Sequence, residues 1–213
     1  MGLDMNSLEQ IVDPKETALL IIDMQNDYCH VDGACGRAGS DASSVKAIVS
    51  PLNSLIENAR RVNLKIIFIR TIHDEWTDSS AIRSLPRYEE WSNELCRPDT
   101  WGAEFFGVLP QPGDYVITKH RNSAFINTSL DLVLRSIGMK TIIVTGVSTH
   151  ICVECTVRDG FQYDYFPVVP ADCTDSGRSD VQVLNSALNR IDGRWGKVVT
   201  SGEIAQAWGL VQD

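Results

Sequence analysis

Basic side chains are scarce in this sequence compared with acidic ones. Its 213 residues include 19 Lys or Arg and 28 Asp or Glu, so the formal net charge is −9. An acidic surface repels the phosphates of nucleic acids, and the chain contains no basic run and no nucleic-acid-binding motif. We therefore expect no nucleic-acid partner.

Long apolar runs are also absent. The longest, such as "TALLII" at 17–22 and "KIIFI" at 65–69, are far shorter than the roughly 20 residues that a transmembrane helix needs. The segment 1–16 has early acidic residues and lacks the apolar stretch of a secretory signal. These features predict a cytoplasmic protein with no membrane partner.

Cysteine is present, but not in the pattern of a disulfide framework or a zinc site. The cysteines lie inside apolar segments of a long chain, so free thiols are expected. Cys152 and Cys155 form one CxxC pair, and no second CxxC or HxxxH motif supplies further zinc ligands. The sequence therefore predicts no metal and no cofactor. The six cysteines are at positions 29, 35, 96, 152, 155 and 173.

The distribution of apolar residues predicts one domain over 1–213. No linker and no internal repeat divides the chain, and its 43% of hydrophobic residues suffice for one large core. Several apolar runs rich in β-branched residues are continuous, which is typical of strands buried on both faces of a parallel sheet. These predicted strands are 17–22, 64–69, 115–118, 140–145 and 165–169, with a weaker sixth at 196–200.

Segments with helical spacing lie between the predicted strands, at 45–62, 128–138 and 179–191. Alternating strands and helices predict an α/β protein, a three-layer α/β/α sandwich with a mostly parallel, doubly wound sheet. Residues 1–13 are expected to form a loose N-terminal arm. The stretch 71–113 has several aromatic residues and prolines, which favours a lid-like insertion.

Reactive side chains follow three of the predicted strands. Asp23 follows the first strand, Lys119 ends the third, and Cys152 follows the fourth after a turn at Gly146. Ligands of open α/β sheets bind beyond the carboxyl ends of the strands. We therefore expect these three side chains to meet at one edge of the sheet.

Together the three groups suit nucleophilic catalysis. The positive end of the helix that Cys152 opens is expected to lower the pKa of its thiol. Asp23 can accept the thiol proton and return it to a leaving amine, while Lys119 can stabilise negative charge. Backbone N–H groups near Ser148 can form an oxyanion hole.

Three blocks of this sequence resemble the isochorismatase-like cysteine hydrolase superfamily. They are "LLIIDMQNDY", "WGAEFF" and "ITKHRNSAFINTSLDLVLRSIGMKTIIVTGVSTHICVECTVRDG", and the resemblance covers roughly residues 14–208. It implies a six-stranded parallel sheet and a homo-oligomer, either a dimer or a tetramer. It also implies a catalytic triad of Asp23, Lys119 and Cys152, and a cis peptide between Val147 and Ser148 at the oxyanion hole.

Within that superfamily the sequence favours one branch. Nicotinamidases carry an Asp-x-His…His metal cluster after the second strand, whereas this chain has His73 alone there. Isochorismatase proper lacks the working cysteine. The blocks around Asn122 and Cys152 look closest to ureidoacrylate amidohydrolases and to biuret and triuret hydrolases. The resemblance therefore implies hydrolysis of a C–N bond in a small ureido or carbamoyl amide, through a covalent thioacyl or thiocarbamoyl enzyme that releases ammonia or an amine.

Five polar or aromatic residues near the strand ends are candidates for substrate binding. One of them departs from the pattern of the branch, because Asn122 stands where close relatives often carry Tyr. The candidates are Asn26, His73, Trp76, Asn122 and His150.

Two alternatives stay open. The first is a thiol–disulfide redox protein that uses Cys152 and Cys155, and the second is another amidase of the superfamily, such as an N-carbamoyl amino acid hydrolase. Substitution of each cysteine by serine distinguishes the redox alternative from a hydrolase. A redox pair needs both thiols, whereas a hydrolase needs only Cys152.

Overall fold

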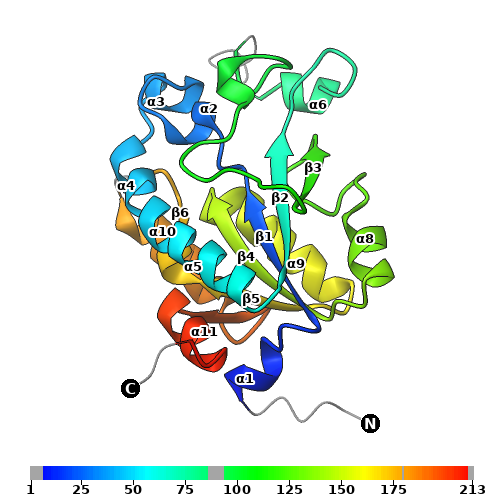
Figure 1. Cartoon of the computed structure of the whole chain (residues 1–213). Coiled ribbons are helices and arrows are strands. Elements are labelled where there is room, and N and C mark those ends of the chain that lie inside the picture. The colour runs from blue at the N-terminus through cyan, green and yellow to red at the C-terminus, as the bar shows by residue number, and fades with distance from the viewer. Residues whose placement is uncertain (1–6, 86–93, 179, 211–213) are drawn as a thin grey trace.

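Seven parallel strands in the described part of the chain form a single sheet (Figure 1). The computed structural model describes residues 7–85, 94–178 and 180–210. The strand order is β3–β2–β1–β4–β5–β7, with β6 paired to β4. The strands are β1 (Thr17–Ile22), β2 (Lys65–Thr71), β3 (Tyr115–Lys119), β4 (Thr141–Val147), β5 (Phe166–Pro170), β6 (Thr174–Asp175) and β7 (Lys197–Val199).

The parallel α/β class is confirmed, and the expected number of six strands is wrong. All six predicted strands form, and their ends lie within two residues of the prediction. The additional strand, β6, contains only Thr174 and Asp175, which pair with Gly146 and Val147 of β4. Two polar residues give no hydrophobic run, so the sequence pattern could not indicate this strand.

The order of the strands reverses beside β1. From β1 the chain builds β2 and β3 on one side, and it then returns to add β4, β5 and β7 on the other. In doubly wound sheets such a reversal leaves a crevice beyond the carboxyl ends of the two central strands. Here that crevice lies beyond Ile22 of β1 and Val147 of β4.

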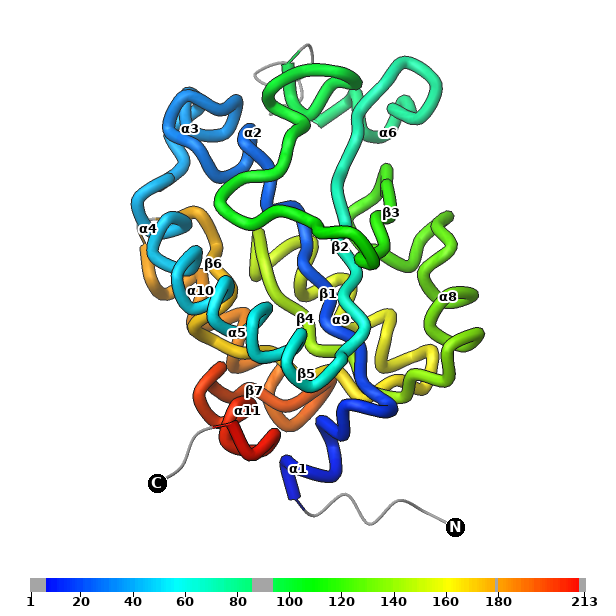
Figure 2. Tube along the Cα trace, in the orientation of Figure 1, coloured from blue at the N-terminus to red at the C-terminus, as the bar shows by residue number. Residues whose placement is uncertain are grey.

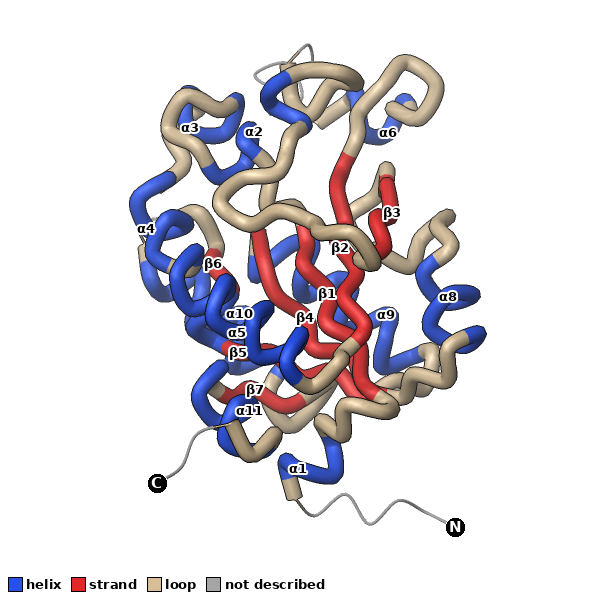
Figure 3. The backbone as a smooth tube through the Cα atoms, in the orientation of Figure 1, coloured by secondary structure: helices blue, strands red, loops and turns tan. Residues whose placement is uncertain are grey.

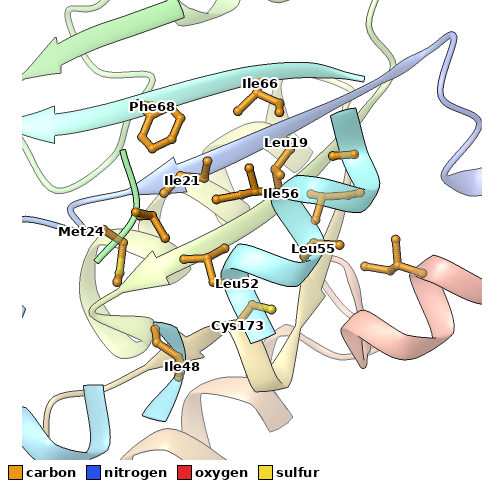
Figure 4. Packing of buried hydrophobic residues seen from close by; sticks show 14 of the residues in the cluster. Leu19, Ile21, Met24, Ile48, Leu52, Leu55, Ile56, Ile66, Phe68 and Cys173 are labelled. Carbon is orange, nitrogen blue, oxygen red and sulfur yellow. The ribbon is translucent and has the colours of Figure 1, made fainter. Parts of the chain in front are cut away.

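Side chains of the central strands alternate between two cores. Leu19 and Ile21 of β1 face the layer that contains the longest helix, α5 (Val49–Arg61), as Figure 4 shows. Leu20 and Ile22 face the opposite layer. Both faces of β1 are buried, which explains why its sequence is a continuous apolar run rather than an alternating one.

The helices form the two outer layers and the loops at the carboxyl edge. The predicted segment 45–62 is divided between α4 (Ala42–Ala47) and α5, because Pro51 lacks an N–H group and its ring clashes with a helical carbonyl four residues earlier, at Ala47. The remaining helices are α1 (Leu8–Ile11), α2 (Asn26–Cys29), α3 (Ala34–Arg37), α4 (Ala42–Ala47), α6 (Ser80–Arg83), α8 (Leu130–Ser136), α9 (Glu154–Gln162), α10 (Val181–Ile191) and α11 (Ser201–Ala207).

The N-terminal segment differs from the expected loose arm. Residues 1–6 lie outside the described residues, but Leu8–Ile11 form α1 and Val12 is fully buried. The indole Nε1 of Trp208, which follows α11, donates a hydrogen bond to the Val12 carbonyl at 2.8 Å. Apolar contacts with the end of the chain therefore hold this segment against the body, and α1 and α11 lie together at the amino end of β1 (Figure 2).

Long loops gather beyond the carboxyl ends of β1 and β2, where Figure 3 shows them above the sheet. The predicted insertion 71–113 contributes α6 and a short 3₁₀ turn at Trp101–Ala103, and its residues 86–93 lie outside the described part. A bridge between Gln25 and Phe105 ties the insertion to the segment after β1. No helix in the described residues is long and apolar enough to cross a membrane.

Candidate active site

The three predicted reactive side chains meet at the carboxyl edge of the sheet. The Nζ atom of Lys119 lies 2.8 Å from Asp23 Oδ2 and 3.4 Å from Cys152 Sγ. Asp23 and Lys119 are each 1% exposed, and Cys152 is 9% exposed. An acid, an ammonium group and a thiol therefore share one buried cluster.

Strand order explains how Lys119 reaches Asp23. Lys119 ends β3 and Asp23 follows β1, so the end of β2 lies between them. Thr71, the last residue of β2, bridges the gap: its hydroxyl donates to Asp23 Oδ1 and accepts from Lys119 Nζ, both at 2.8 Å. Sequence reasoning missed Thr71. The rule that found the other three would have found it, since Thr71 also stands at the carboxyl end of a strand.

A turn of π-helix carries Cys152 from β4 toward the cluster. This turn spans Thr149–Val153, and α9 begins only after it, at Glu154. The hydroxyl of Thr156 donates to the Cys152 carbonyl at 2.7 Å and accepts from the Ala124 N–H at 3.0 Å. The position of the thiol is thus fixed by local backbone contacts and by a neighbouring loop.

Burial reverses the expected effect on the Cys152 thiol. Desolvation, together with the nearby Asp23 carboxylate, outweighs the attraction of Lys119 and raises the pKa of Cys152 to about 12. The prediction of a lowered pKa was wrong because it considered the helix dipole and not the burial. At neutral pH the resting group is the thiol.

For the ammonium group of Lys119, attraction by its neighbours outweighs the effect of burial on the pKa. Its burial lowers its pKa, but the Asp23 carboxylate and the Cys152 sulfur together raise it to about 12. Lys119 is therefore charged at neutral pH, and it can compensate negative charge on either neighbour.

The peptide bond between Val147 and Ser148 is cis, as the resemblance implies. The Ser148 carbonyl accepts hydrogen bonds from the N–H groups of Ile151 and Val153, which turn the chain directly from β4 toward Cys152. Just before this point Gly146 has a φ of 97°, and a Cβ atom there would collide with the Ile22 carbonyl of β1. Glycine is required where the two central strands approach each other.

A cavity of about 250 Å³ opens beside the buried cluster. Asp23, Lys119 and Cys152 contribute to its wall, as do Ser148 and Thr71. Apolar and aromatic side chains from the carboxyl edge also line it. These are Tyr28 of α2, Ile82 of α6, Leu85 and Leu95.

Three of the five predicted substrate-binding residues line this cavity, namely His73, Asn122 and His150. The other two do not belong to its wall. Asn26 begins α2 and donates its amide to the Trp101 carbonyl at 2.8 Å, so it fixes a loop. Trp76 is 89% exposed on the loop after β2. Their positions near strand ends were correct, but the direction of each side chain depends on loop packing.

His73 is oriented by a buried carboxylate. Its Nδ1 lies 2.7 Å from Asp78 Oδ1, and the other oxygen of Asp78 lies 3.1 Å from Arg97. Asp78 is only 5% exposed. Because the Asp78 carboxylate contacts Nδ1, the second ring nitrogen of His73 is available to contact a molecule in the cavity.

Three guanidinium groups line the cavity, and sequence reasoning missed all of them. Arg97 is paired with Asp78, and the other two belong to Arg121 and Arg178. Arg121 donates to the carbonyl oxygens of Thr77 and His120, at 3.0 and 2.6 Å. Arg178 lies on the exposed rim. Neither forms an ion pair with any carboxylate in the described part of the chain.

The second cysteine of the CxxC pair lies apart from the cavity wall. Cys155 is half-buried on α9, and burial together with Asp159 and Glu154 raises the pKa of its thiol. All six cysteines are free thiols, as expected. Within the described residues no three His, Cys, Asp or Glu side chains group as metal ligands.

Known proteins resemble this chain in sequence and in fold. The model of the isochorismatase domain matches residues 17–203. The ureidoacrylate amidohydrolase RutB of Pseudomonas syringae pv. syringae is 37% identical over an alignment of 174 residues, and the match covers 76% of this chain and 71% of that protein. The RutB protein of Caulobacter vibrioides is 34% identical over an alignment of 211 residues, and the match covers 93% of each chain.

A solved structure shares the whole architecture. The cysteine hydrolase from Pseudomonas syringae pv. phaseolicola 1448A superposes with a TM-score of 0.84 at 28% identity. The superposition covers 92% of this chain and 94% of that one.

Proposed function

The chain belongs to the isochorismatase family and is a hydrolase of C–N bonds in non-peptide amides, and from this premise we propose that it cleaves a small ureido or carbamoyl compound through a covalent intermediate on Cys152. The observation that carries the proposal is the placement of Lys119 Nζ between Asp23 Oδ2 and Cys152 Sγ in a cavity wall. This arrangement suits a nucleophile, a proton acceptor and a fixed positive charge.

In the first step the Cys152 sulfur attacks the carbonyl carbon of the substrate. The raised pKa of the thiol means that its proton must leave as the C–S bond forms, and Asp23 accepts that proton. Lys119 stays charged beside both groups. The carbonyl oxygen becomes an oxyanion, and we assign its stabilisation to the Ser148 N–H, a role that the cis peptide before it supports.

In the second step the C–N bond breaks. Asp23 gives its proton to the departing nitrogen, so that ammonia or an amine leaves and a thiocarbamoyl or thioacyl group remains on Cys152. Water then attacks this group while Asp23 accepts a water proton. Cleavage of the C–S bond releases the carbamate or acid, and the proton returns to the sulfur.

Charge in the cavity supports an acidic substrate. Lys119 and Arg97 are paired with Asp23 and Asp78, whereas Arg121 and Arg178 have no carboxylate partner among the described residues. On a protein with a net charge of −9, a local excess of positive charge favours an anion. We therefore place an acidic ureido compound of the ureidoacrylate type ahead of neutral biuret and triuret.

Ammonia or amine release from a panel of compounds tests the proposal. The panel contains ureidoacrylate, biuret, triuret, N-carbamoyl amino acids and nicotinamide, with Cys152→Ser as the blank. Release from a ureido compound by the wild type and not by the blank is the expected result. Release from nicotinamide alone, or equal release by the blank, contradicts the proposed function.

A further inference from the structure

Thr71 stands at the centre of the buried cluster, although its own side chain has no reactive group. It is the last residue of β2 and is 3% exposed. Its hydroxyl contacts the two charged groups of the cluster, Asp23 Oδ1 and Lys119 Nζ, each at 2.8 Å. The two contacts engage both hydrogen-bonding functions of the hydroxyl.

The direction of these hydrogen bonds follows from the chemistry of the partners. An ammonium group has three donors and no acceptor, so Thr71 Oγ1 must accept from Lys119. The single hydroxyl proton is then directed to Asp23 Oδ1, since a carboxylate can only accept. The chain Lys119 to Thr71 to Asp23 has one polarity, and its members strengthen one another.

The backbone of Thr71 is held as firmly as its side chain. The amide of Gln25 donates to the Thr71 carbonyl at 3.0 Å and accepts from the Thr71 N–H at 2.7 Å. The same amide group donates to the Ala103 carbonyl at 2.9 Å. Gln25 is fully buried, so it locks the end of β2 between the segment after β1 and the insertion.

We propose that Thr71 is a positioning residue that fixes Asp23 as the acceptor of the Cys152 proton. Its hydroxyl donates a hydrogen bond to Asp23 Oδ1. The other carboxylate oxygen, Oδ2, which contacts Lys119, then receives the proton. The proposal rests on the proposed function, because it assigns Thr71 a part in the same first step. Without the hydroxyl, the carboxylate loses a donor that stabilises its charged form.

Substitutions that keep the shape of the side chain test this role. Thr71→Val removes the hydroxyl, and we expect kcat/KM to fall by about 10- to 100-fold, since hydrogen bonds to charged groups are strong. The pH–rate profile should also change, because Thr71 contacts both charged groups of the cluster, Asp23 and Lys119. Thr71→Ser keeps the hydroxyl, and we expect it to restore both the rate and the profile.

Thr141→Val is a matched control. Thr141 is also 3% exposed, and its hydroxyl donates to the Ile11 carbonyl at 2.6 Å, at the opposite end of the sheet. Thr71→Val loses two side-chain hydrogen bonds and Thr141→Val loses one, so both variants should unfold at a lower temperature than the wild type. Only Thr71→Val should change the pH profile.

Several titratable side chains around Asp23 can contribute to the pH–rate profile. They are Lys119, Cys152, Tyr28, Cys29 and Cys96. Any of them that titrates in the measured range contributes to the limbs. The comparison with Thr141→Val accounts for the groups that Thr71 does not contact, whereas Lys119, which Thr71 does contact, belongs to the cluster under test. A Thr71→Val profile that superposes on the wild type, or a Thr71→Ser variant as impaired as Thr71→Val, overturns the proposal.

A second measurement separates this inference from the proposed function. If the wild type hydrolyses no ureido compound, the proposed function fails, but the cluster can still be examined through the rate at which iodoacetamide alkylates Cys152. The Thr71→Val variant should change the pH dependence of this rate, and Thr141→Val should not. Identical pH dependence in Thr71→Val and the wild type overturns the positioning role in that case as well.

Discussion

Lys119 and Asp23 form a fully buried ion pair, and the end of β2, which contributes neither residue, lies between them. Their contact of 2.8 Å joins β3 to the segment after β1, over the carboxyl end of β2. An ion pair in this setting is costly to bury and is retained only with good geometry and further hydrogen bonds. Thr71 supplies those bonds, and Cys152 completes the cluster.

The ion pair predicts that the losses of stability caused by substitutions at Asp23 and at Lys119 depend on each other. Asp23→Asn or Lys119→Met alone should destabilise the fold by about 3–5 kcal/mol, because each leaves an unpaired buried charge or polar group. The double variant should recover part of that loss. Urea unfolding of the wild type, both single variants and the double variant measures the coupling. Strictly additive losses would show that the two side chains do not interact.

The same variants separate stability from chemistry. If Asp23 and Lys119 act in the reaction, turnover should fall by orders of magnitude in all three variants, including the more stable double variant. Steady-state kinetics on folded protein, with circular dichroism as the control for folding, measures this. Near-wild-type turnover in either single variant removes that residue from the proposed mechanism.

The two cysteines of the CxxC pair should behave differently. Cys152→Ser should abolish turnover, since the hydroxyl is a far weaker nucleophile in this site. Cys155→Ser should leave turnover within about threefold of the wild type, because Cys155 lies outside the cavity wall. Loss of activity in both variants would favour the redox alternative over the hydrolase.

Alkaline pH should destabilise the protein through the buried cluster. The pKa of Cys152 is raised from 9.0 to about 12, so between these values the folded state holds a proton that the unfolded state has lost. Lys119, raised from 10.5 to about 12, acts in the same direction. The stabilisation is thus complete below about 9 and is lost as the pH rises toward 12.

The free energy of unfolding in urea, measured at increasing pH, checks this expectation. Cys152→Ser lacks the titrating thiol and should show a shallower decline than the wild type. The buried thiols of Cys29 and Cys173, whose pKa values burial also raises, remain in both proteins and provide the common background. Parallel declines in the two proteins would contradict the contribution of Cys152.

Arg121 should determine the preference for an acidic substrate. Arg121→Gln should raise KM for an acidic ureido compound by about 10- to 100-fold, because a charge-assisted hydrogen bond to the carboxylate is lost. KM for a neutral compound such as biuret should change little. Arg178→Gln is the companion variant on the rim of the same cavity. Equal increases for acidic and neutral compounds would indicate a general loss of cavity shape.

The resemblance to the family predicts a dimer or a tetramer. Light scattering combined with size-exclusion chromatography measures the mass in solution, relative to the 23.6 kDa of one chain. Dilution through the micromolar range tests whether the assembly is stable. A mass of one chain at all concentrations would contradict this prediction.

The sequence by itself determined six of the seven strands and the three reactive positions. Strands such as Thr17–Ile22 are buried on both faces, and their continuous apolar runs are visible without any tertiary information. Because parallel strands end at one edge, Asp23, Lys119 and Cys152 could be brought together from the pattern alone. The parallel α/β class and the family resemblance are both confirmed, the first by the sheet and the second by the matching family model and relatives.

The tertiary structure decided what depends on contacts between distant segments. The strand β6 exists only through its pairing with β4, and the Thr71 hydroxyl gains its two hydrogen bonds only when Asp23 and Lys119 lie on either side of β2. Asn26 and Trp76 were assigned to the substrate from their positions, but loop packing turned both away from the cavity. The pKa of Cys152 followed from burial, a property of the assembled core that no local sequence pattern encodes.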